Sequence, residues 1–215
     1  MRECIYLTSL ARDGVAFMTS EIGVPVVVLP GAWSRVDLSS DEAARASTKR
    51  IAEKAVGKGD AGARLRAELR ERILSAVSPA REKGAVEFHF AQELTTGVPL
   101  SASLAVFVVR ADLAELDSLG GADMSRLVSE SVKDGSTDTA IDAGSLGVVR
   151  RTYKRKYVES DAPELPILQA DYWVTGVRPA RVAILSFSTA FVEFEEQMLE
   201  LFDAILKTIR WDAAL

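Results

Sequence analysis

The sequence predicts an α+β protein in which helices flank an antiparallel β-sheet. Segments of alternating hydrophobicity follow one another between residues 86 and 174, separated by short turns. Two alanine- and leucine-rich helical segments precede them, and a strand followed by a long amphipathic helix closes the chain. A chain of 215 residues is long enough to bury a sizeable core.

The final segment, residues 180–211, carries the clearest fold information. Residues 181–187 are apolar on both alternating sets, which is typical of a central strand covered on both faces. We expect the hydroxyl of Ser188 or Thr189 to cap the helix that follows. Its apolar side chains recur at steps of three and four, so the helix is expected to lay one stripe on the sheet. That stripe is Phe191, Phe194, Met198, Phe202, Ile205 and Ile209.

The chain divides at residue 24 into a short N-terminal segment and one domain. Residues 1–23 are weakly specified, whereas residues 24–215 read as a single α+β domain. Within this domain, residues 24–29 form an apolar run bounded by prolines, which favours a strand at a sheet edge.

A helical hairpin is expected over residues 41–84. Ser39 and Glu42 stand at capping-box spacing at the start of a helix over residues 41–56. A second helix begins near Asp60, and Pro79 is expected to kink or end it.

Several segments of the middle region have the period of two that a half-buried strand requires. Residues 148–158 and 167–174 are expected to form a long hairpin whose inward side includes Leu168 and Tyr172. A short helix is expected over residues 124–132. The expected strands cover residues 86–94, 100–108, 137–141, 148–158 and 167–174.

Composition restricts the classes of function. The formal net charge of −5 argues against a chain dedicated to nucleic acid or to an anionic membrane. A single cysteine, Cys4, cannot form an internal disulfide. No signal peptide is recognisable, and the longest apolar run, residues 100–109, is far shorter than the about 20 residues that span a bilayer. We therefore expect a cytoplasmic protein.

Catalytic signatures are absent from the sequence. His89 is the only histidine, so a metal site with two histidines is excluded, and a Ser-His-Asp arrangement would have to use it. The spacing of Gly57, Gly59 and Gly62 fits the glycine pattern of a dinucleotide-binding motif. That motif requires a strand before the glycines, however, and here a helix precedes them. We expect a turn between helices there, and no catalytic residue, metal site or cofactor.

The most distinctive surface candidate is the segment RRTYKRKY, residues 150–157. It interleaves five cations with two tyrosines, a composition typical of single-strand nucleic-acid grooves. The simpler interpretation is a solvent-facing strand whose cations are balanced by Asp171 across the hairpin or by acids of the loop 159–164. Trp173 is expected beside Asp171 on the side opposite Leu168. The candidate partner-contact residues are Arg151, Tyr153, Arg155, Tyr157, Asp171 and Trp173.

Three stretches carry a resemblance to a known family. They are VVVLPGAW at residues 26–33, AREKGA at residues 80–85, and LSFSTAF with ELFDAILKTIRW at residues 185–211. With them the chain resembles uncharacterised actinobacterial proteins that have a PsbP-like fold, an α/β/α sandwich. The wider fold includes a subunit of the photosynthetic oxygen-evolving complex, a nuclear-import regulator, mycobacterial lipoproteins and chaperones of secreted effectors. The resemblance implies binding of other macromolecules and assigns no active-site residue.

Three hypotheses of function follow. The leading one is a non-enzymatic, protein-binding adaptor or chaperone-like module with a protein partner that the sequence does not identify. The alternative is an enzyme of unrecorded type, a hydrolase that uses carboxylates in a groove between helices and sheet. Nucleic-acid binding through residues 150–157 is a third hypothesis, which the net charge and the adjoining acidic loop disfavour.

Overall fold

The computed structural model describes residues 25–110, 136–146, 148–158, 165–175 and 181–211. Over these residues the protein is an α+β structure with one large antiparallel sheet, one two-stranded sheet and three α-helices. The coarse fold class predicted from the sequence is therefore confirmed. The expected helix at 124–132 lies outside the described residues.

The large sheet has eight strands, and all its neighbouring strands are antiparallel. The last long strand, β9, lies at its centre between β5 and β8, as its apolar sequence predicted. Across the sheet the order is β2 (Ala32–Val36), β3 (Glu87–Thr95), β5 (Ala102–Arg110), β9 (Arg181–Thr189), β8 (Leu165–Thr175), β7 (Val148–Val158) and β6 (Thr137–Asp142), with β4 (Val98–Pro99) paired to β3. A separate pair joins β1 (Pro25–Val26) to β10 (Arg210–Trp211).

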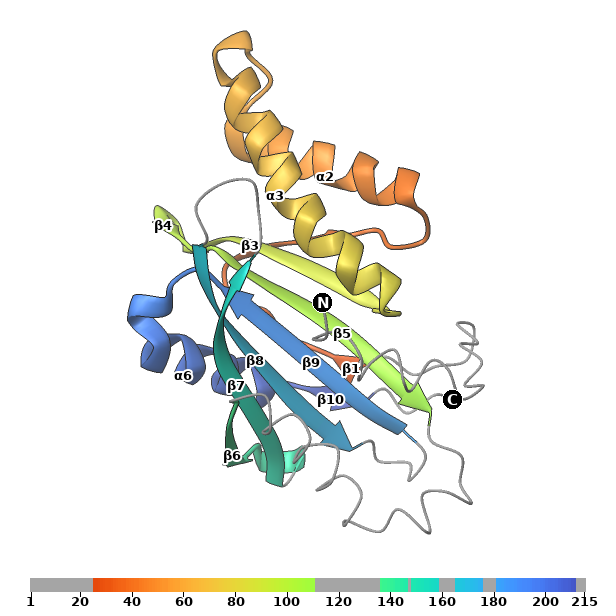
Figure 1. Cartoon of the computed structure of the whole chain (residues 1–215), viewed down its shortest axis with the longest axis vertical. Helices are drawn as coiled ribbons and strands as arrows, with labels where there is room; N and C mark the ends of the chain where they lie inside the picture. The colour runs from red at the N-terminus through yellow and green to blue at the C-terminus, as the bar shows by residue number, and fades with distance from the viewer. Residues whose placement is uncertain (1–24, 111–135, 147, 159–164, 176–180, 212–215) are drawn as a thin grey trace.

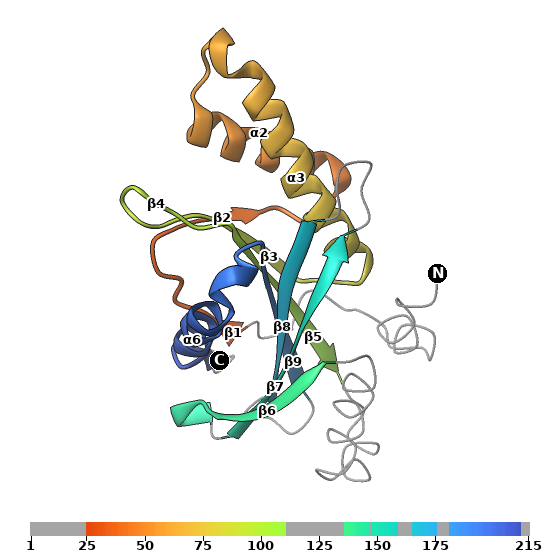
Figure 2. The ribbon, with the colours of Figure 1, turned by 60° about the vertical axis from the view of Figure 1, so that its left-hand side comes forward.

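The three helices are placed differently on the sheet. The helices α2 (Asp41–Val56) and α3 (Ala63–Glu82) pack on each other near β2 and β3 and project beyond the sheet (Figure 1). The helix α6 (Glu195–Leu206) lies on one face of the sheet, which Figure 2 shows nearly edge-on. Each face of the central strands is therefore covered by a different helical element.

The core under α6 is built around aromatic rings. Phe187 of β9 stacks on Phe202 of α6 with ring centroids 4.5 Å apart. Tyr172 of β8 meets Phe187 edge-on at 5.6 Å. All three side chains are fully buried, so they fix α6 on β8 and β9 by packing rather than by exposed polar contacts.

A second core lies on the opposite face. Ile73 and Val77 of α3 pack there with Phe88 of β3 and Phe107 of β5. Ile184 of β9 belongs to this cluster, whereas its neighbours in sequence face α6. The prediction that both faces of the last strand are covered is thus confirmed.

The start of α6 differs from the prediction. A 3₁₀ turn, Val192–Phe194, follows β9, and the α-helix begins only at Glu195 without a side-chain cap. The Thr189 hydroxyl instead accepts a hydrogen bond of 3.1 Å from the backbone N–H of Phe191, which stabilises the turn. Because the chain is still turning at this point, the Phe194 side chain leaves the apolar stripe and is 58% exposed.

For the other helices, the expected N-cap was wrong, and of the two outcomes expected at Pro79 the ending of the helix does not occur. The N-cap of α2 is Ser40 rather than Ser39, because the Ser40 Oγ accepts a hydrogen bond of 3.0 Å from the backbone N–H of Ala43. Pro79 does not end α3, which continues to Glu82. Proline has no backbone N–H, so Pro79 costs α3 one internal hydrogen bond within its last two turns. The helix tolerates this loss and continues.

Candidate functional site

The six predicted contact residues do not form one surface. Strand alternation places Arg151, Tyr153, Arg155 and Tyr157 on the side of β7 that faces α6, as the packing of Tyr153 against the α6 core shows. Asp171 and Trp173 of β8 lie on the other face, and Trp173 packs against the α2–α3 core. The expectation that Asp171 and Trp173 share a face opposite the core set of β8 is confirmed.

Arg151 is held inside the fold. Its Nη1 donates to Oδ2 of Asp203 on α6 at 2.7 Å, and the Tyr172 hydroxyl donates to Oδ1 of the same carboxylate at 2.6 Å. The guanidinium also lies 5.3 Å from the ring centroid of Tyr153. Burial, followed by the hydrogen bond to Asp203, raises the pKa of Tyr172 above its ordinary value. This network connects β7 and β8 to α6 and is a structural element.

Arg155 and Tyr157 lie on an exposed surface where β7 ends and α6 begins. Arg155 Nε donates to Oε2 of Glu195 at 2.6 Å, and this hydrogen bond raises the pKa of the guanidinium. Tyr157, two residues further along the same face, is 66% exposed. Phe194 is adjacent to Glu195, and its ring meets Phe191 edge-on at 6.5 Å. We call these five residues the aromatic surface.

The predicted charge balance of β7 is found in part at Asp171, on which the charges of Lys154 and Lys156 act, but the partners of its arginines were not predicted. Arg150 pairs with Asp138 of the neighbouring strand β6, while Arg151 and Arg155 pair with acids of α6. The loop acids 159–164 lie outside the described residues. Arg150, Arg151 and Arg155 are thus neutralised by acids of β6 and α6, which weakens the basis for a nucleic-acid groove.

A polar strip occupies the sheet face opposite α6. Gln169 Nε2 donates to both carboxylate oxygens of Asp171, at 3.0 and 2.9 Å, and approaches the Ser186 hydroxyl at 3.3 Å. Burial raises the pKa of Asp171, although the hydrogen bonds from Ser186 and Gln169 and the charges of nearby lysines act in the other direction. The indole Nε1 of Trp173 is buried without a hydrogen-bond partner. Burial therefore makes the carboxyl group of Asp171 easier to protonate than one exposed to water.

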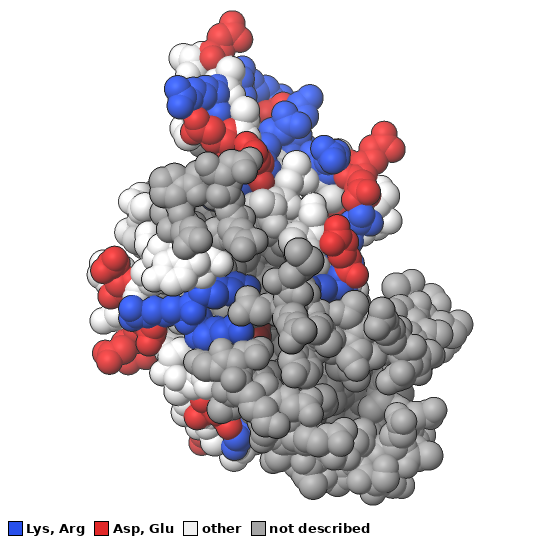
Figure 3. All heavy atoms as spheres, in the orientation of Figure 1, with Lys and Arg blue, Asp and Glu red and all other residues white. Residues whose placement is uncertain are grey.

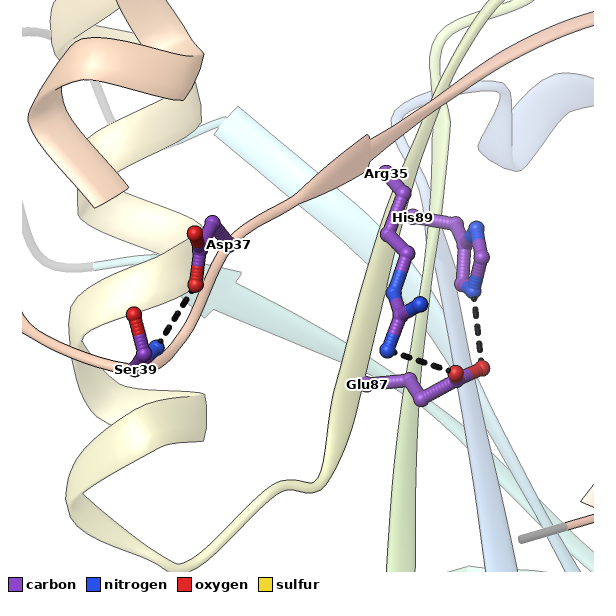
Figure 4. Close-up of polar contacts among 5 residues, drawn as sticks. All are labelled: Arg35, Asp37, Ser39, Glu87 and His89. Atoms are coloured by element: carbon purple, nitrogen blue, oxygen red, sulfur yellow. Dashed lines mark hydrogen bonds and ion pairs between the residues drawn. The ribbon is translucent and has the colours of Figure 1, made fainter. Parts of the chain in front are cut away.

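A third cluster was not predicted from the sequence. His89 Nε2 lies 3.1 Å from Oε2 of Glu87, and Arg35 of the edge strand β2 pairs with Oε1 of Glu87 at 2.9 Å (Figure 4). Alternation along β3 places Glu87 and His89 on one side, but the register of β2 against β3 is needed to add Arg35. Asp37, also in Figure 4, binds the backbone N–H of Ser39 instead and belongs to the turn before α2.

The His89 cluster positions an imidazole but contains no nucleophile. The side chains of Glu87 and His89 are 18% and 17% exposed, so the carboxylate can orient the ring at a partly desolvated edge of the sheet. The hydrogen bond from His89 lowers the pKa of Glu87 most strongly, and the charge of Arg35 adds to this effect. No group of three or more His, Cys, Asp and Glu suited to a metal ion occurs in the described ranges.

Glu87→Gln is expected to make stability less dependent on pH. Because the folded pKa of Glu87 lies below its ordinary value of 4.5, the carboxylate stabilises the folded state above the unfolded pKa. This contribution is lost as the pH falls through the folded pKa. We expect the variant to lose about 1 kcal/mol of unfolding free energy near neutral pH and almost nothing in strong acid. Urea unfolding across the acid range measures this, and a loss that is independent of pH would contradict it.

Together the fold and its clusters define an α+β protein with a large antiparallel sheet covered by helices on both faces. Comparison of the chain with protein-family models, curated proteins and solved structures found no match. In the described part of the chain, every helix is too short or too polar to cross a membrane. The functional assignment therefore rests on the geometry of the surfaces.

Proposed function

We propose that the protein is a non-enzymatic, protein-binding module of adaptor or chaperone-like type, acting in the bacterial cytoplasm. The proposal includes the finer fold assignment, a PsbP-like sandwich in which α2 and α3 form a helical hairpin. One observation carries the functional part. Tyr157 and Phe194, which stand close in sequence to the ion-paired residues Arg155 and Glu195, expose 66% and 58% of their surface.

Exposed aromatic side chains in this arrangement fit a protein interface. Single exposed apolar residues are common on protein surfaces, whereas grouped ones mark interaction sites. Tyrosine and arginine are enriched among the residues that dominate binding energy, and an aromatic ring loses little conformational entropy when it is covered. The ion pair between Arg155 and Glu195 joins β7 to α6, so the aromatic surface is anchored on two packed elements.

The test is an affinity purification of partners from a bacterial lysate with the double variant Tyr157→Ala/Phe194→Ala. The wild-type protein is expected to retain one stoichiometric protein partner, and the variant is expected to bind it at least about tenfold more weakly. The matched control is Val98→Ala/Val148→Ala, which removes two other exposed apolar side chains, 46% and 73% exposed. Equal retention by the two double variants would contradict the proposal.

One observation favours the alternative of a hydrolase. Burial raises the pKa of Asp171, and a carboxyl group of raised pKa suits a general acid. Gln169 and Ser186 already engage this carboxyl group, however, and a hydrolase of this kind requires a second carboxylate across a substrate. Turnover that is lost in Asp171→Asn but kept in Tyr157→Ala/Phe194→Ala would favour the enzyme.

A further inference from the structure

The outer half of the α2–α3 pair, residues 54–72, contributes little to the core, where only Leu69 packs against the buried cluster. None of these residues is buried, and the buried side chains of α3 begin at Ile73. Figures 1 and 2 show the two helices extending well beyond the sheet. A helical projection without a fully buried side chain adds little to stability, which points to a role at the surface. We call this segment the basic tip.

The charge of the basic tip is opposite to that of the protein. It contains six Lys and Arg and three Asp and Glu, within a chain whose formal net charge is −5. Figure 3 shows Lys and Arg spheres along the projecting helices, with fewer acids between them. A local positive potential on an acidic protein attracts an acidic partner to this place in particular.

Part of this positive charge is not used inside the fold. Arg64 pairs with Glu68 at 2.8 Å, and Arg66 donates to the carbonyl oxygens of Gly57 and Gly59 at 2.7 Å each. These contacts order the turn between the helices. Four further cations have neither an ion pair nor a side-chain hydrogen bond within the described structure: Lys54, Lys58, Arg70 and Arg72.

Next to Arg70, α3 offers an apolar contact. A shallow hollow of about 460 Å³ runs along one side of the helix. Ala67 and Leu74 supply its apolar surface, and Arg70 and Glu71 stand beside them. Leu65, one turn before Leu69, is 57% exposed at the same end of the helix. A ligand at this place therefore meets both positive charge and apolar surface.

We infer that the basic tip binds an acidic polypeptide segment. Carboxylates of the segment pair with Arg70 beside the hollow, and an apolar side chain rests on Ala67 and Leu74. The charges of Lys58 and Arg72 add to the local positive potential that attracts the segment. Nucleic acid fits less well, because Glu71 lines the same hollow and the protein as a whole is acidic. This inference rests on the proposed protein-binding function and adds a contact separate from the aromatic surface.

The test uses the full chain and two fluorescent probes, poly-glutamate and a copolymer of glutamate and tyrosine. At low salt both are expected to bind, the copolymer more tightly, and binding is expected to weaken as salt is added. Lys58→Glu/Arg70→Glu/Arg72→Glu is expected to lower the affinity at least about tenfold. The control Arg45→Glu/Lys83→Glu/Lys207→Glu changes the net charge equally at exposed positions elsewhere and is expected to bind within about twofold of wild type.

Three results would overturn the inference. The first is equal weakening by the two triple variants, and the second is tighter binding of duplex DNA than of either polypeptide. The third is self-association of the protein that is abolished both by salt and by the Lys58→Glu/Arg70→Glu/Arg72→Glu variant. In that case the basic tip would bind the exposed acids of α6 on a second copy of the protein. The aromatic-surface variant Tyr157→Ala/Phe194→Ala should still bind the probes. If only the probe assay fails, the inference about the basic tip is wrong and the proposed function stands. If only the lysate purification fails, the proposed function is wrong.

Discussion

Phe202→Ala is expected to lower the free energy of unfolding by about 3 to 5 kcal/mol. Phe202 is fully buried on α6 and stacks on Phe187 with ring centroids 4.5 Å apart. Its removal leaves a cavity between helix and sheet, where the rigid strands β8 and β9 cannot collapse to fill the space. Equilibrium unfolding in urea, followed by circular dichroism, measures the loss.

Phe194→Ala is the matched control for this prediction. It removes the same ring from the beginning of the same helical segment, but Phe194 is 58% exposed. The expected loss is below about 1 kcal/mol, because little surface is taken out of water there. Similar losses in the two variants would show that α6 does not pack as described.

Asp203→Asn is expected to destabilise the protein by about 2 to 4 kcal/mol. The substitution keeps the volume of the side chain but removes the charge that Arg151 and the Tyr172 hydroxyl share. Arg151 then keeps a buried positive charge without a counter-charge. The side chains of Arg151 and Asp203 are 11% and 20% exposed, so residual solvent contact keeps the loss below that of a fully buried pair.

A thermal or urea unfolding comparison with Glu200→Gln tests this second prediction. Glu200 lies on the exposed side of α6, so the control changes the charge of the helix equally and leaves the network intact. Its expected effect is within about 0.5 kcal/mol of zero. A similarly small effect of Asp203→Asn would contradict the view that this carboxylate fixes α6 on the sheet.

The sequence by itself determined the type and position of most elements. Strands were expected at residues 137–141, 148–158 and 167–174, and the structure places β6, β7 and β8 there. The two early helices were expected in the regions where α2 and α3 occur. These features depend on the local periods of two and 3.6 residues, which neighbouring residues fix without help from distant parts of the chain.

The candidate surfaces were predicted only in part. Arg155 and Tyr157 were singled out from the composition of their strand, but Phe194 was placed in the core. Its periodicity matched a helix capped at Ser188 or Thr189, whereas α6 begins only at Glu195. The cluster of Arg35, Glu87 and His89 was missed, because the sequence does not state which strand lies beside β3.

Only the tertiary structure decided which charges meet. The cations of β7 were expected to be balanced by the adjoining loop or by Asp171. The charges of Lys154 and Lys156 do act on Asp171, whereas the ion pairs of Arg150, Arg151 and Arg155 reach Asp138, Asp203 and Glu195. A local pattern gives the side of a strand on which a residue lies, but not the element that covers that side. Strand order and the docking of α6 are set by burial of apolar surface throughout the chain, and the ion pairs follow from that arrangement.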